Sequence, residues 1–227
     1  MKSTFRPFFI ASIGALLLAG CSTSGWFARV PSRSAKPVAE DGHAPRNYVG
    51  DARLPASIRR VVLLPVHGGE FALPEDSESL DPVMATALER QMRFEVVTLP
   101  REDCMHLCGQ PDISSAASLP HDFLRQIGDK YDAQAVLFVD VTAYEAYRPL
   151  TLGLRAKLAS VADQRLIWSF DEIYSTSDPA VVAAVRTYYQ HNELGNLPFD
   201  LSQDALQSPS RFAAYAANQT FHTLPIR

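Results

Sequence analysis

The hydrophobic residues of this chain fall into short blocks, and their spacing predicts alternating strands and helices. Residues 58–66 form a nearly continuous apolar run, which is typical of a strand covered on both faces. Residues 94–99 predict a second strand. A helix is predicted between them, beginning at Asp81–Pro82 because proline suits the first helical position. Its apolar stripe consists of Met84, Leu88 and Met92.

The rest of the chain continues this alternation and then changes to consecutive strands. Another helix is predicted to open at Leu119–Pro120, after a loop over residues 101–118. Three strands are predicted next, at residues 134–144, 150–158 and 166–174. Two final helices are predicted to begin at Asp178–Pro179 and at Ser208–Pro209. The order β-α-β-α-β-β-β-α-α predicts an α/β fold, with a mixed parallel and antiparallel sheet packed by helices.

The N-terminus has the pattern of an export signal. Lys2 and Arg6 precede an apolar run over residues 8–18, which is too short for a stable membrane-spanning helix. The run ends in Leu18-Ala19-Gly20-Cys21, which resembles the bacterial lipobox. This resemblance implies that residues 1–20 are a removed signal peptide and that acyl chains on Cys21 anchor the protein in a membrane. The alternative is an ordinary secretory signal followed by a chance cysteine.

The segment that follows Cys21 differs in composition from the rest of the chain. Residues 21–57 are rich in proline, serine and basic residues and have little apolar periodicity, so they are predicted to be a flexible tether. The folded domain is predicted to span residues 58–227. Ser22, directly after the cysteine, resembles the sorting signal of proteobacterial lipoproteins that reside in the outer membrane and face the periplasm.

Composition excludes several classes of protein. The chain has 227 residues, of which 47% are hydrophobic, so it is not a disordered protein. Its formal net charge is −4, which gives no basic footprint for nucleic acid. The only long apolar run lies at the N-terminus, which excludes a polytopic membrane protein.

The apolar blocks resemble those of a group of envelope lipoproteins. The group includes curli-secretion-channel lipoproteins and penicillin-binding-protein activators, with a domain similar to the amino-terminal domain of TolB. The blocks that carry the resemblance are Arg60–Val66, Arg93–Val97, Tyr131–Leu137 and Arg165–Ser169. It implies a periplasmic α/β domain that works by contacting other envelope proteins. The predicted partner is another cell-envelope protein or the cell wall, and no cofactor is predicted. The chain lacks the long extra hairpins of a curli-type pore.

Two cysteines remain after Cys21. An even number of cysteines in an oxidising compartment favours a disulfide between Cys104 and Cys108. Two free thiols are an alternative, and so is a metal site that also uses Asp103 and His106. The spacing lacks the C-x-x-C pairs that are typical of zinc sites, so no metal is predicted.

No catalytic motif is present, and the predicted function is that of a non-enzymatic accessory protein of the envelope. The alternative is an envelope enzyme or small-ligand binder that uses His67, Gly68 and Gly69, which follow the first strand where open α/β sheets often bind ligands. The acidic residues on or near the predicted strands are candidates for acid–base work, although strands often place such residues on solvated faces. They are Asp140, Glu145, Asp171 and Glu172.

Overall fold

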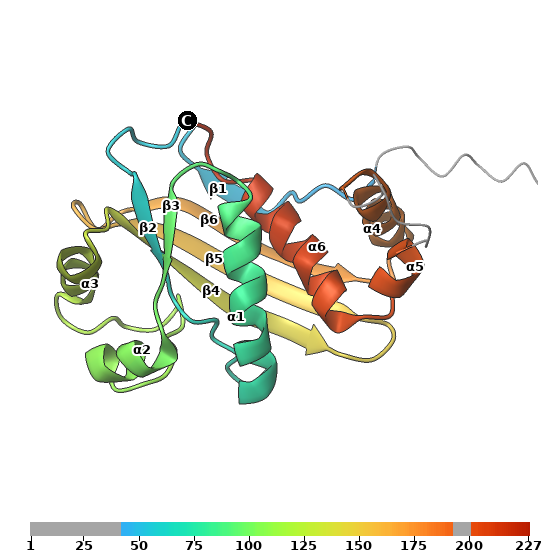
Figure 1. Ribbon diagram of the computed structural model, residues 1–227, viewed down its shortest axis with the longest axis horizontal. Helices are drawn as coiled ribbons and strands as arrows, with labels where there is room; N and C mark the ends of the chain where they lie inside the picture. The colour runs from blue at the N-terminus through green and yellow to red at the C-terminus, as the bar shows by residue number, and fades with distance from the viewer. Residues whose placement is uncertain (1–41, 193–200) are drawn as a thin grey trace, which may run out of the picture. The chain divides into compact units, whose positions relative to one another are not determined.

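The computed structural model of the protein describes residues 42–192 and 201–227. They form a six-stranded sheet in the order β1-β6-β5-β4-β2-β3 (Figure 1). The strands are β1 (Tyr48–Gly50), β2 (Arg60–Leu63), β3 (Glu95–Thr98), β4 (Ala135–Glu145), β5 (Thr151–Ser160) and β6 (Leu166–Ser175). β3, β2 and β4 are parallel, whereas β4, β5, β6 and β1 pair antiparallel. The predicted mixed α/β sheet is therefore confirmed.

The described residues also form six helices that pack on this sheet. They are α1 (Pro74–Glu89), α2 (Arg101–Cys108), α3 (Phe123–Tyr131), α4 (Pro179–Asn192), α5 (Leu201–Ala205) and α6 (Pro209–His222). No helix in the described ranges is long and apolar enough to cross a membrane.

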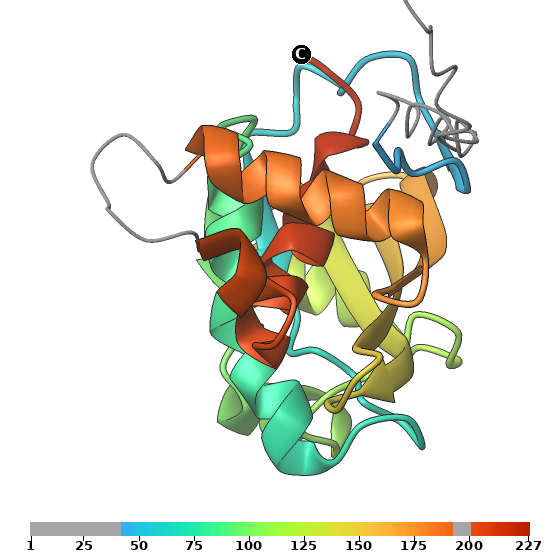
Figure 2. The ribbon, with the colours of Figure 1, turned by 90° about the vertical axis from the view of Figure 1, so that its right-hand side faces the viewer.

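One face of the sheet carries the larger core. α1 and α6 run side by side over this face (Figure 1), and α4 and α5 lie at the end of the sheet that Figure 2 turns toward the viewer. The aromatic rings of Trp168 and Phe170 are stacked on β6, and Tyr174 meets Tyr215 of α6 edge to face. Burial of these large side chains is the main source of stability on this face.

The opposite face is covered over only part of its width. α2, α3 and the segment between them cover β2 and β4, where Val62, Val136 and Phe138 pack against Cys104 and Phe123. We call this part the covered half.

By contrast, β6, β1 and most of β5 lie outside this cluster on the same face, and Ala159 is the one described residue of β5 that belongs to it. The strand register places the side chains of Lys157, Ser169 and Val49 in one row there, and those of Arg155 and Asp171 in the next. Val49 is 74% exposed, Leu166 53% and Ile173 55%. We call these residues the open sheet surface: Val49, Arg155, Lys157, Leu166, Ser169, Asp171 and Ile173.

The predicted boundary of the domain at residue 58 is wrong. β1 lies within residues 21–57, which were predicted to be tether, and pairs with β6. Leu54 is buried, and its N–H donates to the Ile226 carbonyl at 2.7 Å. A three-residue strand is too short to show an alternation of apolar and polar residues, so β1 could not be predicted from its residues.

Two further element predictions need correction. The first helix begins at Pro74 and not at Asp81, and Pro82 lies inside it. Asp81 does not cap the helix, because its carboxylate accepts the Val66 N–H instead. The predicted loop over residues 101–118 contains α2, which ends at Gly109 in the left-handed conformation.

Candidate functional site

A network of charged side chains lies at the carboxyl end of β2. We call it the β2 network: His67, Asp81, Arg101 and Asp112. Arg101 Nε donates to Asp81 Oδ2 at 2.9 Å, and Nη1 donates to Asp112 Oδ2 at 2.8 Å. The third nitrogen, Nη2, donates to the Val66 carbonyl at 2.9 Å. His67 Nδ1 lies 2.6 Å from Asp112 Oδ1.

The β2 network joins four separate parts of the chain. Asp81 is on α1, Arg101 is on α2, Asp112 is in the segment before α3, and His67 follows β2. The Val66 N–H also donates to Asp81 Oδ1 at 2.8 Å. Burial raises the pKa of Asp81, although the hydrogen bonds from Val66 and Arg101 oppose this shift. Through these bonds the network connects α1, α2 and the segment before α3 to the end of β2.

Of the predicted ligand residues, His67 belongs to this network and forms a parallel bridge with Asp140, whereas Gly68 and Gly69 lead from it into a tight turn. A Cβ at Gly68 would lie 2.9 Å from the Ala72 carbonyl oxygen, and Gly69 has a φ of +56°. Glycine is required here by the turn itself. A hollow of about 350 Å³ lies nearby, lined by Asp81, Arg101 and other residues, but His67, Gly68 and Gly69 do not line it. Ligand binding at these three residues stays a prediction.

The four candidate acids have different partners and do not form one site. Asp140 is 3% exposed and accepts the Ser115 N–H at 2.9 Å, so it fastens the segment between α2 and α3. Glu145 is exposed at the end of β4. Asp171 and Glu172 point to opposite faces of β6. Asp171 accepts from Arg155, and Glu172 Oε1 lies 3.3 Å from His43 Nε2.

The predicted disulfide between Cys104 and Cys108 is not formed in the structure. The two residues lie one turn apart on α2 as free thiols, with their Sγ atoms 3.5 Å apart. A disulfide needs a separation of about 2.05 Å. Burial raises the pKa of Cys104 to about 12, so its thiol stays protonated at neutral pH.

The metal alternative at the cysteines has no support in the geometry. Asp103 receives hydrogen bonds from Lys130 and Tyr131. Within residues 42–192 and 201–227, no group of three or more histidine, cysteine or acidic side chains has the arrangement of a metal site.

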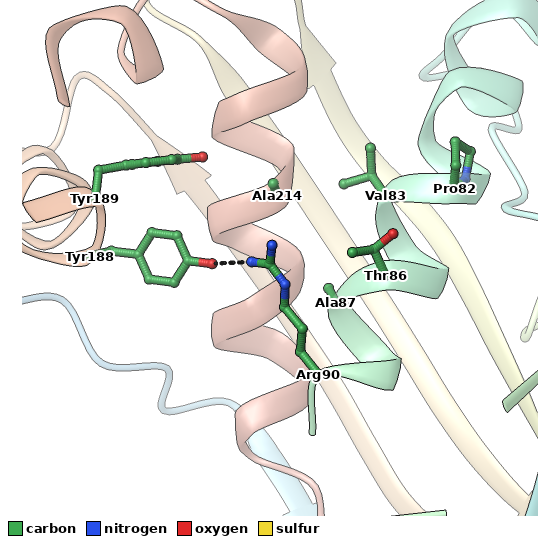
Figure 3. Close-up of a pocket in the computed structure, with 8 residues that line it drawn as sticks. All are labelled: Pro82, Val83, Thr86, Ala87, Arg90, Tyr188, Tyr189 and Ala214. Carbon is green, nitrogen blue, oxygen red and sulfur yellow. Dashed lines mark hydrogen bonds between the residues drawn. The ribbon is translucent and has the colours of Figure 1, made fainter. Parts of the chain in front are cut away.

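A groove of about 290 Å³ lies between α1, α4 and α6 (Figure 3). Its walls are mainly apolar, and Arg90 Nη1 donates to the Tyr188 hydroxyl at 3.3 Å across it. The lining residues are Pro82, Val83, Thr86, Ala87, Arg90, Tyr188, Tyr189 and Ala214. The sequence pattern gave no sign of this groove, because its walls come from three distant helices.

The open sheet surface combines charged and apolar groups. Arg155 Nε donates to Asp171 Oδ2 at 2.8 Å, and Lys157 Nζ donates to the Ser115 carbonyl at 2.9 Å. A shallow hollow of about 190 Å³ runs past these side chains to Val49. Cys21, the predicted lipid site, lies outside the described residues.

No protein-family model and no curated protein sequence matches this chain. Among solved structures, the chain is similar to the PelC dodecamer from Paraburkholderia phytofirmans, with 12% identity and a TM-score of 0.48, over 79% of this chain and 96% of that one. Lipoprotein GNA1162 from Neisseria meningitidis has 14% identity and a TM-score of 0.41, over 53% and 85%. The LpoB C-terminal domain from Salmonella enterica has 20% identity and a TM-score of 0.34, over 53% and 86%. Sequence identities and TM-scores this low say nothing about the function of this chain.

Proposed function

We propose that this protein is a lipid-anchored envelope protein whose α/β domain works through contacts with another envelope component, without catalysing a reaction. The observation that carries this proposal is the open sheet surface. Val49, Leu166 and Ile173 are exposed there around an arginine–aspartate pair. Surfaces that bind other proteins combine apolar and charged groups, and this uncovered part of the sheet offers both.

The sequence of the N-terminus supports the anchoring half of the proposal. The lipobox-like residues Leu18–Cys21 follow a positively charged and then apolar segment. Acyl chains on Cys21 would fix the protein to the bilayer durably. Ser22 supports a location in the outer membrane, where the domain would face the periplasm. Its partner would then be an envelope protein or the cell wall.

Metabolic labelling tests the anchor. Cells that express the tagged full chain are fed an alkyne analogue of palmitate, and their membranes are separated by density. We expect label on the wild type in the outer-membrane fraction, no label on Cys21→Ala, and unchanged label on Cys108→Ala as the matched control. Label on Cys21→Ala would contradict lipidation at this cysteine, and labelled protein confined to the inner membrane would contradict the proposed location.

Cross-linking in whole cells tests the contact. A tagged, lipidated chain is cross-linked and purified, and a reproducible envelope partner is expected. Ile173→Asp should reduce its recovery at least tenfold, because it replaces an exposed apolar side chain of the open sheet surface with a charge. Unchanged recovery of the partner with Ile173→Asp would contradict a role for the open sheet surface.

A further inference from the structure

A further hollow lies between α4, α5 and the turn that joins β4 to β5. We call it the α4–α5 pocket, and its volume is about 490 Å³. This size is within the range of small-molecule sites. The pocket is lined by Arg148, Pro149, Thr176, Val182, Arg186, Gln203 and Leu206.

Two arginines in this pocket have no side-chain partner among the residues that the structure describes. Arg148 and Arg186 both line it, and within the described residues neither makes an ion pair or a side-chain hydrogen bond. Other arginines of the domain are used differently: Arg60, Arg101 and Arg155 each bind a carboxylate. Arg148 and Arg186 are therefore available for a ligand.

The charge of the pocket contrasts with the charge of the protein. The chain has a formal net charge of −4, yet among the described residues that line this pocket there is no aspartate or glutamate. Two like charges in one hollow repel each other, and an anion bound between them removes that repulsion. The planar guanidinium group matches the geometry of carboxylate and phosphate oxygens.

The remaining lining residues suit a ligand that is larger than a bare ion. Thr176 offers a hydroxyl group and Gln203 an amide, whereas Pro149, Val182 and Leu206 provide apolar walls. Polar groups of this kind bind hydroxyl groups, and the apolar walls accommodate the carbon skeleton. The two arginines supply the charge that the anionic group needs.

We propose that the α4–α5 pocket binds a carboxylate or phosphate group carried on an organic body of about one sugar or amino-acid residue. Arg148 and Arg186 bind the anionic group from two sides. Thr176 and Gln203 bind hydroxyl groups of the attached body. The pocket is separate from the open sheet surface and from the lipid anchor, so failure of either proposal leaves the other standing.

Calorimetric titration of the detergent-solubilised full chain tests this inference. The probes are glucuronate for a carboxylate, glucose 1-phosphate for a phosphate, and glucose as the neutral match. We expect saturable binding of at least one anionic probe and none of glucose. Tighter binding of glucuronate would identify a carboxylate ligand, and tighter binding of glucose 1-phosphate a phosphate ligand.

Arginine variants test whether the anionic probes bind in the α4–α5 pocket. Arg148→Gln and Arg186→Gln are each expected to weaken it at least tenfold, and the double variant to abolish it. Arg53→Gln is the control, because Arg53 is also exposed but lies outside the pocket, and its affinity should stay within twofold of the wild type. Unchanged thermal unfolding would show that the variants are folded. The inference is overturned if neither anion binds at 10 mM, or if the pocket variants bind like Arg53→Gln.

Discussion

The covered half and the open half of one sheet face differ in the connections between their strands. β2, β3 and β4 are parallel, so the chain must cross over between them, and α2 and α3 lie in the crossover from β3 to β4. β4, β5 and β6 are antiparallel and are joined by short turns. A short turn brings no helix back over the sheet. The mode of strand connection therefore decides which half of the face is covered by helices.

The residues on the two halves follow this difference. Facing the same side, β4 presents Val136 and Phe138 to α3, whereas β5 presents Arg155 and Lys157 next to solvent. The apolar residues of the open half are isolated ones, such as Ile173. One sheet face therefore carries buried apolar side chains at one end and solvent-accessible charged side chains at the other.

The largest effect is expected from an aromatic residue in the covered half. Phe138→Ala should lower the free energy of unfolding by about 3 to 5 kcal/mol, because it removes buried surface and leaves a cavity. Ile173→Ala, the matched change on the open half, should cost under about 1 kcal/mol. Urea unfolding followed by circular dichroism measures both. Equal losses would show that the open half is also buried.

Smaller losses of stability are expected from two arginine–aspartate contacts, one in the β2 network and one on the open sheet surface. Arg101→Met leaves Asp81 and Asp112 without their shared partner in a partly buried site, so we expect a loss of about 2 to 3 kcal/mol. Arg155→Met removes one contact with Asp171 on the open surface and should cost at most about 1 kcal/mol. The same urea experiment applies. A larger loss from Arg155→Met than from Arg101→Met would contradict our view that Arg101 stabilises the fold more than the exposed Arg155 does.

The smallest effect is a difference in pH dependence between two aspartates on α1 and α2. Burial raises the folded-state pKa of Asp81, so its contribution to stability is present below its ordinary value of 3.8 and is lost as the pH rises through the raised pKa. Hydrogen bonds, chiefly from Tyr131, lower the pKa of Asp103, so its contribution is present above 3.8 and is lost as the pH falls.

Unfolding free energies of the wild type, Asp81→Asn and Asp103→Asn between pH 3 and pH 7 measure this difference. The stability of the wild type relative to Asp81→Asn should fall as the pH rises, and relative to Asp103→Asn it should rise. Slopes of the same sign would contradict the opposing environments of the two carboxylates.

The regular strands and most helices were predictable, because their apolar residues form blocks of readable spacing. β1 was missed because Tyr48–Gly50 is too short for a pattern and pairs with a strand more than a hundred residues away. α2 was missed because its eight residues are mostly polar or small, and its two cysteines favoured a disulfide loop.

The candidate sites were harder to predict than the fold. The β2 network takes Asp81, Arg101 and Asp112 from three separate segments, and only the folded chain brings them together. The same holds for Arg148 and Arg186 in the α4–α5 pocket. A sequence identifies such residues one by one but gives no distance between them.

Site-specific photocross-linking in living cells tests the central claim most directly. A photoreactive amino acid replaces Ile173 on the open sheet surface of the full-length protein, and in a second strain it replaces Met92, which is 89% exposed and lies just beyond α1. We predict a discrete cross-linked envelope partner from position 173 and none from position 92. The same products from both positions, or none from position 173, would contradict it.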